Sequence, residues 1–267
     1  MKKILALVLA AVLCTVAFVS CGASDEKTIT VAASSTPHAE ILEQCKPILS
    51  EQGYKLEIRV MSDYITPNTA TDSGDVDANY FQHQPYLDSF NAENGTKLNT
   101  VVKVHYEPLG IYAGTVSSLD ALTDGAIVTI PNDPTNGARA LLLLEANGLI
   151  ELMDGVGVAA TVNDITANPK NLDIREMEAA LIPGVLDEAA IGVINGNYAI
   201  GAGLKVADSL AQEEADSEAA QTYANILVVK EGNENSEKIK ALADALLTDT
   251  IRDYINSTYA GAVVPIF

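Results

Sequence analysis

The stretch "KTITVAASSTPHAEILEQCKPILSEQGYKLEIRVMSDY", residues 27 to 64, carries an alternating pattern of secondary-structure signals. It opens with the β-branched run "KTITVAAS", which is typical of a short strand. "PHAEILEQCKPILSEQGY" then places apolar residues at helical spacing and closes on Gly53. Since "KLEIRVMSDY" alternates as a strand does, the stretch predicts a βαβ unit with a parallel, right-handed crossover.

The same alternation continues downstream. "SGDVDANYFQHQPYLDSFNAENG" predicts a turn and a helix, "LNTVVKVHYEPLGIYAG" predicts strands, and "SLDALTDGAIVTIP" predicts a helical turn that leads into a strand. "IPNDPTNGARALLLLEANGL" predicts a helix with Asn136 and Gly137 at its start and Arg139 in its first turn. "YANILVVKEG" predicts a strand before one final helix, "SEKIKALADALLTDTIRDYINSTY". The order predicts an α/β protein.

Residues 1 to 20, "MKKILALVLAAVLCTVAFVS", have the layout of a secretory signal: two lysines followed by an apolar run that is too short for a membrane-spanning helix. Ser20 and Cys21 resemble the cleavage site of bacterial lipoproteins, in which the cysteine is diacylated and becomes the mature N-terminus. We therefore expect an exported chain anchored to the membrane by a lipid on Cys21, with residues 21 to 27 as a tether.

The chain is strongly acidic, with 16 basic and 36 acidic residues. Removal of the signal would take away two lysines, which leaves 14 basic residues against 36 acidic ones and a formal charge of −22. Such a surface repels phosphate polymers, and no basic stripe with interleaved aromatic residues is present. We expect no nucleic-acid partner. The remaining length suits one large domain or two modest lobes.

Seven segments resemble, in the same order, the methionine-binding lipoproteins of the MetQ/NlpA family, and together they extend over nearly the whole mature chain. They are "AASSTPHAEILEQCKPIL", "VMSDYITPNTATDSGDVDANYFQHQPYLDSFN", "TIPNDPTNGARALLLLEANGLI", "ATVNDITANPKNLDI", "INGNYAIGAGL", "YANILVVKEGNEN" and "GAVVPIF". The resemblance implies a two-lobed, periplasmic-binding-protein-like fold with a ligand cleft between the lobes. It also implies that the protein captures L-methionine and delivers it to the permease and ATPase of an ABC importer.

The chain should cross between lobes at "YEPLGIYAG" and "QTYANILVV". This predicts lobe one from residues 28 to 109 plus 226 to 267, and lobe two from residues 110 to 225. We expect a monomer tethered to the outer face of the cytoplasmic membrane, which is the periplasmic side if the cell has two membranes.

A free amino acid offers a carboxylate, an ammonium and a side chain to a binding site. Asn136 and Arg139 stand near a predicted helix start, where backbone N–H groups and a guanidinium can converge on one anion. The resemblance assigns Arg139 as the carboxylate anchor. The alternative is an arginine that pairs with a neighbouring acidic side chain.

The methionine side chain needs an apolar, polarizable slot, and "DANYFQHQPYLDSF" places Phe81, His83 and Tyr86 within six residues. Thioether sulfur packs well against aromatic edges. By resemblance these three and Tyr64 line the methionine pocket, while Tyr80 points the other way. The alternative is an ordinary aromatic core patch.

The ammonium needs acceptors. By resemblance the pocket asparagine is Asn195 rather than Asn197, and its amide can accept from the ammonium while donating to the carboxylate. Asn225 matches another pocket asparagine of the family, and Glu107 could complete the ammonium site. The alternative is that these asparagines are turn or cap residues.

Three other classes of protein fit the sequence less well. His38, His83 and His105 could hold zinc together with a carboxylate, but no two of them have tight ligand spacing. The chain lacks the G-x-S-x-G and H-E-x-x-H motifs of hydrolases, and Cys45 sits in a helical apolar pattern that predicts a buried residue. The third class, a surface adhesin, would bind large partners and need no deep cleft, so the aromatic cluster and Arg139 argue against it.

The sequence therefore predicts a binding protein rather than an enzyme, with no cofactor and no metal. Within this class the ligand stays open: D-methionine, a methionine-containing dipeptide and another small amino acid are alternatives to L-methionine.

Overall fold

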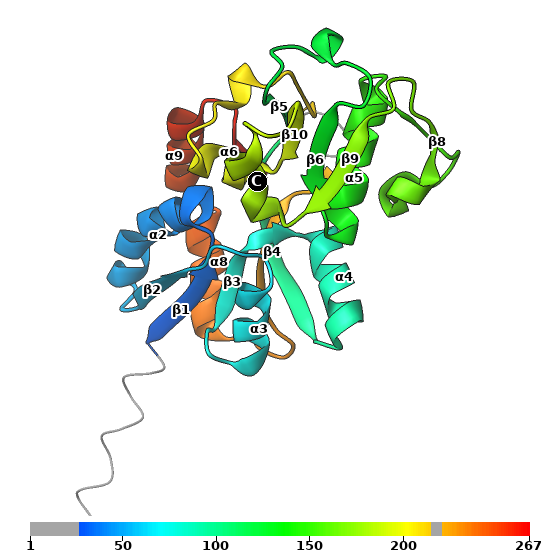
Figure 1. Cartoon of the computed structure of the whole chain (residues 1–267). Helices are drawn as coiled ribbons and strands as arrows, with labels where there is room; N and C mark the ends of the chain where they lie inside the picture. The colour runs from blue at the N-terminus through cyan, green and yellow to red at the C-terminus, as the bar shows by residue number, and fades with distance from the viewer. Residues whose placement is uncertain (1–26, 215–220) are drawn as a thin grey trace, which may run out of the picture.

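The computed structural model describes residues 27–214 and 221–267. The predicted signal, the lipidation site Cys21 and the tether up to residue 26 lie outside these residues. Two sheets organise the described chain, with helices packed around each of them (Figure 1).

The first sheet has six strands in the order β13-β4-β12-β3-β1-β2. Its strands are β1 (Thr28–Ala33), β2 (Lys55–Val60), β3 (Ala78–His83), β4 (Leu98–Tyr106), β12 (Asn225–Lys230) and β13 (Val264–Pro265). β1 and β2 pair in parallel, and helix α2 (Glu40–Glu51) connects them, so the parallel βαβ unit is confirmed. The α2 face that carries Cys45 is buried against the sheet, as the apolar spacing predicts.

The prediction of only a turn and a helix between residues 73 and 95 was wrong, because the central strand β3 precedes the helix. Every residue of β3 is buried, so its sequence shows no polar and apolar alternation. Asn79 and Gln82, which resemble surface residues in the sequence, are buried and bonded to Asn68 from α3 (Thr66–Ser73) at 3.0 and 2.6 Å. These bonds give the three buried amides partners inside the lobe.

The predicted single C-terminal helix was also wrong. Two helices occupy this stretch, α8 (Glu237–Leu246) and α9 (Asp249–Tyr259). Thr248 adopts an extended backbone conformation between them and stands at the N-cap of α9, with Asp249 in the first turn. The Thr248 hydroxyl donates back to the Ala245 carbonyl at 2.9 Å and makes no cap bond to α9, so the acidic Asp249 in the first turn is the group that favours a new helix start here.

The second sheet has five strands in the order β11-β5-β10-β6-β9. They are β5 (Gly110–Ala113), β6 (Ile127–Pro131), β9 (Asp173–Met177), β10 (Ile191–Ile194) and β11 (Ala211–Gln212). β7 (Glu151–Leu152) and β8 (Ile165–Ala167) form a separate pair. The remaining helices are α4 (Gln84–Asn94), α5 (Pro134–Ala146) and α6 (Gly196–Gly201), with short turns η1 (Ser35–Ala39), η2 (Leu119–Ala121), η3 (Gly157–Ala159), η4 (Val162–Asp164), η5 (Ala179–Val185) and η6 (Val206–Asp208).

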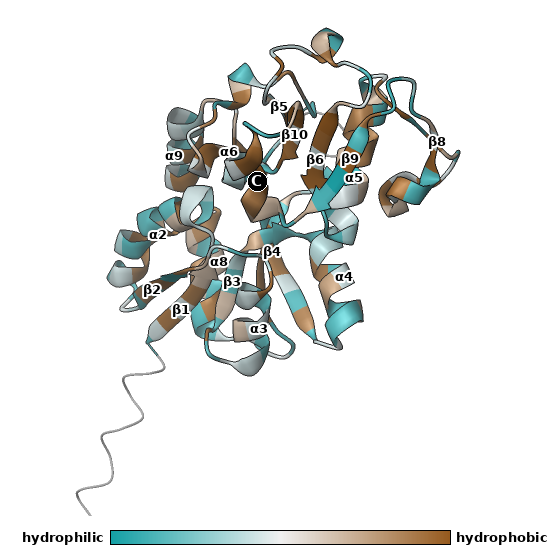
Figure 2. Cartoon of the chain, viewed as in Figure 1, coloured by the Kyte–Doolittle hydropathy of each residue, from teal (hydrophilic) through white to brown (hydrophobic). Residues whose placement is uncertain are grey.

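The strands of the two sheets separate along the chain into two lobes. The chain passes from the first sheet to the second between Tyr106 and Gly110, and returns between Gln212 and Asn225. These passages support the predicted lobe boundaries, which stay a prediction. β6 and β10 are the most hydrophobic strands of the second lobe, and each lobe buries its own apolar core (Figure 2). Within the described residues, no helix has the length and apolar character needed to cross a membrane.

Candidate ligand-binding site

A largely enclosed pocket lies between the two lobes and is lined by residues of both. The structure brings all nine predicted contact residues to its lining: Tyr64, Phe81, His83, Tyr86, Glu107, Asn136, Arg139, Asn195 and Asn225. Three of them stand where a strand ends: His83 closes β3, Glu107 follows β4 and Asn195 follows β10. Ligand sites of open α/β sheets form at such ends. That these residues bind a ligand stays a prediction.

Arg139 reaches the pocket from the second turn of α5. The prediction of the first turn was wrong, because the helix begins earlier, at Pro134, with Asp133 as its N-cap. The Asp133 carboxylate accepts from the Asn136 backbone N–H at 2.9 Å and from the Asn136 amide at 3.0 Å. The sequence predicts that backbone N–H groups at the helix start help to bind an anion, but Asp133 already accepts from one of them. The guanidinium of Arg139 is therefore the main group that could bind an anion.

Arg139 is also paired with an acidic side chain. Its Nε donates to Glu213 Oε1 at 2.7 Å and its Nη2 to Glu213 Oε2 at 2.5 Å, while Nη2 also donates to the Glu107 carbonyl at 3.0 Å. Nη1 enters none of these three bonds. Burial alone would lower the pKa of Arg139, but the Glu213 carboxylate outweighs it and holds the pKa above its ordinary value. Arg139 thus lines the pocket and forms a buried ion pair at once.

Four aromatic side chains form one wall of the pocket and the space behind it. Phe81, Tyr86 and Phe90 are buried in one cluster, with Tyr64 packed against them. The ring centroids of Tyr64 lie 5.7 Å from those of both Phe81 and Tyr86. Three of these rings, those of Tyr64, Phe81 and Tyr86, line the pocket and give it an aromatic wall, which suits a thioether. Tyr80 does not line the pocket.

Asn136 connects the pocket residues His83 and Asn195. The His83 Nδ1 accepts from the Tyr86 N–H at 3.2 Å, so its Nε2–H donates to Asn136 Oδ1 at 3.1 Å. Burial and the charge of Arg139 lower the pKa of His83 to about 3, which keeps the ring neutral. The Asn195 amide N–H donates to the same oxygen at 2.8 Å, while Asn195 Oδ1 is buried and accepts no hydrogen bond from the described residues. This oxygen is therefore open to a hydrogen bond from a donor in the pocket.

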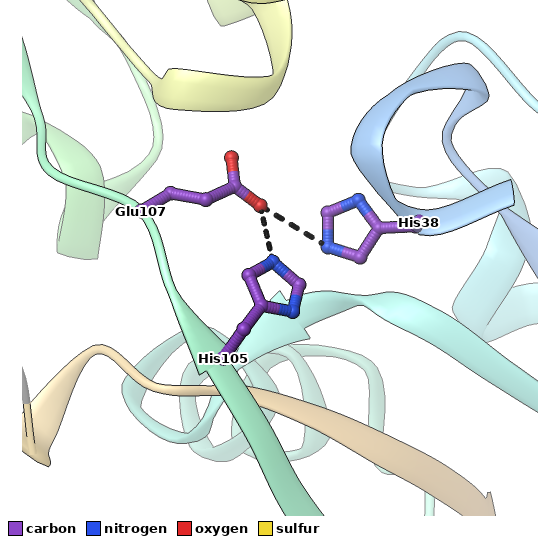
Figure 3. Close-up of side chains that lie close together, drawn as sticks. All are labelled: His38, His105 and Glu107. Carbon is purple, nitrogen blue, oxygen red and sulfur yellow. Dashed lines mark hydrogen bonds and ion pairs between the residues drawn. The ribbon is translucent and has the colours of Figure 1, made fainter. Parts of the chain in front are cut away.

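Glu107 lines the pocket beside two histidines. His105 Nε2 lies 2.7 Å and His38 Nε2 3.4 Å from Glu107 Oε1, and the second carboxylate oxygen points away from both rings (Figure 3). Burial raises the pKa of Glu107, although His38 and Arg139 act in the opposite direction. Asn225 is the first residue of β12, and in the register of the sheet it stands opposite His83 of β3 and His105 of β4.

The sequence spacing gave no sign that His38 and His105 meet, yet their ring centroids lie 5.0 Å apart. Together with Glu107 they offer three ligand atoms within 4.8 Å of one another, while His83 belongs to a different part of the pocket. The lining also includes Gln82, Gly196 and Asn197, which were not predicted. Gly196 could have been recognised only from the fold, because a Cβ there would lie 2.8 Å from Glu107 Oε2.

Hydrogen bonds between the lobes hold the pocket closed. The Tyr64 hydroxyl donates to Asn197 Oδ1 at 2.5 Å, and the Tyr198 hydroxyl donates to the Ser62 carbonyl at 3.2 Å. Tyr64 therefore serves both as part of the aromatic wall and as a latch across the cleft.

We expect Tyr64→Phe to weaken ligand binding about threefold to tenfold and to speed dissociation. The substitution keeps the ring in the wall but removes one hydrogen bond from the closed state, and a net hydrogen bond is worth about 0.5–1.5 kcal/mol. Stopped-flow fluorescence and calorimetry measure both effects. Tyr54→Phe, outside the pocket, serves as the control. Unchanged dissociation in the Tyr64 variant would contradict the latch.

Comparison with known proteins places the chain in a family. The family model for the NlpA lipoprotein matches residues 29–267. The methionine-binding lipoprotein MetQ of Bacillus subtilis is 43% identical over 247 residues, which cover 91% of this chain and 89% of that protein. A lipoprotein structure from Ruminococcus gnavus matches with a TM-score of 0.89 and 58% identity over 90% of this chain and all of that one.

A nutrient-binding protein from Burkholderia cenocepacia, solved bound to methionine, matches with a TM-score of 0.85 and 37% identity over 90% of this chain and all of that one. The resemblance and the two-lobed α/β fold predicted from the sequence are confirmed by these matches. The chain belongs to the NlpA lipoprotein family.

Proposed function

We propose that this protein is a lipid-anchored substrate-binding protein that captures methionine between its lobes and delivers it to an ABC importer. The proposal includes no catalysed step and no cofactor. Support comes from the chemistry of the pocket and from the printed names of relatives, which describe methionine-binding lipoproteins and a methionine-bound structure.

The observation that carries the proposal is a pair of opposite charges at one end of a closed pocket. The Arg139 guanidinium provides the cation, and Glu107 and the unpaired Asn195 Oδ1 provide acceptors. The Arg139 Nη2 donates to the backbone carbonyl of Glu107 at 3.0 Å. Burial raises the pKa of the Glu107 carboxyl and the Arg139 charge acts against it, so the two charged groups lie close enough to interact. An α-amino acid, whose carboxylate and ammonium share one carbon, matches this arrangement.

The other end of the pocket selects the side chain. The aromatic rings of Tyr64, Phe81 and Tyr86 favour an unbranched, polarizable thioether. Each sulfur–aromatic contact is worth roughly 0.3–1.5 kcal/mol. In a dipeptide the ammonium moves away from the carboxylate by a further residue, about 3.6 Å. This displacement separates it from Glu107, so we propose a free amino acid as the ligand.

Calorimetric titration of the purified, ligand-stripped protein tests the proposal. We expect saturable binding of methionine, measured for the L and D forms separately, and at least tenfold weaker binding of glycyl-methionine and glutamine. Tighter binding of the dipeptide would show that the ligand is a methionine-containing dipeptide, while the protein would remain a substrate-binding protein. Heat with zinc alone would contradict the proposed function.

The proposed anchor is Cys21, and the proposed location is the outer face of the cytoplasmic membrane. It is supported by the sequence of residues 1 to 21 and by the lipoprotein family. The proposed partners are the permease and ATPase of the importer, with the chain as a monomer. Cys21→Ser should release the protein from the membrane fraction of cells that express it.

A further inference from the structure

Two buried histidines outside the proposed ligand contacts form a second layer behind the pocket. His38 is 1% exposed and His105 is fully buried. His38 comes from the turn η1 before α2, and His105 comes from β4, two residues before Glu107 (Figure 3). Since neither lines the pocket, the proposed function leaves both unexplained.

His105 connects Tyr80 to Glu107. The Tyr80 hydroxyl is bonded to His105 Nδ1, and His105 Nε2 lies 2.7 Å from Glu107 Oε1. An ionised carboxylate only accepts, so the Nε2 must carry the ring proton, and Nδ1 then accepts the proton of Tyr80. The two hydrogen bonds of this row of three residues therefore run in one direction: Tyr80 donates to His105, and His105 donates to Glu107.

His38 connects Ser34 to Asn225 in the same way. The Ser34 hydroxyl lies 2.6 Å from His38 Nδ1, and His38 Nε2 lies 2.9 Å from Asn225 Oδ1. The Glu107 carboxylate lies 3.4 Å from the same Nε2, which favours a proton there over a lone pair. With its oxygen committed to His38, Asn225 has only its NH₂ group to offer as a donor to a ligand.

We propose that His105 and His38 are positioning residues, which hold the Glu107 carboxylate toward the ligand ammonium and turn the Asn225 NH₂ toward the ligand carboxylate. The inference rests on the proposed function. His105 fixes Glu107 Oε1, and the second oxygen points away from both rings (Figure 3).

A metal ion is the competing interpretation of this cluster, since the three side chains offer ligand atoms within 4.8 Å of one another. Zinc would need a lone pair on each Nε2. In the tautomers inferred above both Nε2 atoms carry a proton, which they donate to Glu107 and Asn225, so a metal would have to displace both protons and break both hydrogen bonds. The network therefore favours an organic cation at Glu107 over a metal.

Imidazole nitrogen NMR of the unliganded wild-type protein tests the two rows without any ligand. We expect both rings to be neutral with the proton on Nε2 from pH 5 to 8, in accord with the burial that lowers the pKa of His38 to about 4 and of His105 to about 3. A proton on Nδ1 in either ring would overturn the inference. Zinc-induced shifts of both rings to metal-bound values would do the same.

Binding of two ligands by two variants tests the consequence for recognition. His105→Leu removes the donor to Glu107, whereas His105→Gln replaces Nε2–H with an amide N–H at a similar distance along the side chain. The ligands are methionine and 4-(methylthio)butanoate, which lacks the amino group. We expect His105→Leu to weaken methionine binding roughly tenfold to 100-fold and binding of the analogue less than threefold, with His105→Gln restoring most of the loss.

Equal losses for both ligands would show a purely structural role and overturn the inference. Failure of wild type to bind methionine would contradict the proposed function, while the NMR result would still report on the two hydrogen-bonded rows.

Discussion

Arg139→Met should weaken methionine binding about 1000-fold or more and lower the free energy of unfolding by about 3–5 kcal/mol. Both effects have one cause, since the guanidinium is the cation proposed for the ligand and the only partner that neutralises Glu213 among the described residues. Glu213 is 11% exposed and Arg139 4%. Removing the arginine therefore leaves the Glu213 carboxylate buried without an opposite charge, which is strongly destabilising.

A double variant separates the two effects. Arg139→Met with Glu213→Gln removes both charges but keeps an amide oxygen to accept from the Tyr106 hydroxyl and the Leu109 N–H, which bond to Glu213 Oε2 at 2.5 and 3.0 Å. We expect it to regain most of the lost stability in urea denaturation and none of the methionine binding in calorimetry. Recovery of binding in the double variant would exclude Arg139 as the carboxylate anchor.

Elements with a regular apolar period could be predicted from the sequence. The strand β3, which buries polar residues, was not predicted. β1, α2 and β2 follow their sequence pattern closely. β3 does not, because Asn79 and Gln82 lie inside the lobe and bond to other buried amides rather than to water. A sequence pattern assumes that polar residues face solvent, so a strand with a buried amide cluster resembles a loop.

The candidate contact residues could be predicted because the family resemblance supplied their positions, and all nine line one pocket. The residues that bond to these contact residues and fix their positions could not be predicted. Glu213 lies 74 positions from Arg139, and His38 lies 187 positions from Asn225. Such partners meet only through the arrangement of the sheets, and their side chains carry no motif of their own.

Glu107→Gln should weaken methionine binding about 100-fold at pH 7. The substitution removes the charge that pairs with the ammonium, and a hydrogen bond between charged groups is worth about 1.5–3 kcal/mol. The glutamine oxygen can still accept from His105 Nε2, which lies 2.7 Å from the native carboxylate, so the fold should persist. Calorimetry with methionine and with 4-(methylthio)butanoate measures the effect, which should be confined to methionine.

The pH dependence of binding distinguishes this role from simple packing. Burial raises the pKa of Glu107 in the free protein, whereas a bound ammonium would favour the ionised form and lower that pKa. Methionine binding should then be constant above the raised pKa and weaken by up to tenfold for each pH unit below it, because the carboxyl must lose a proton before it can pair. Glu107→Gln should remove this fall. A wild-type affinity that stays flat as the pH drops to 4, or a fall that persists in the variant, would assign the ammonium to another acceptor, with Asn195 Oδ1 as the remaining buried one.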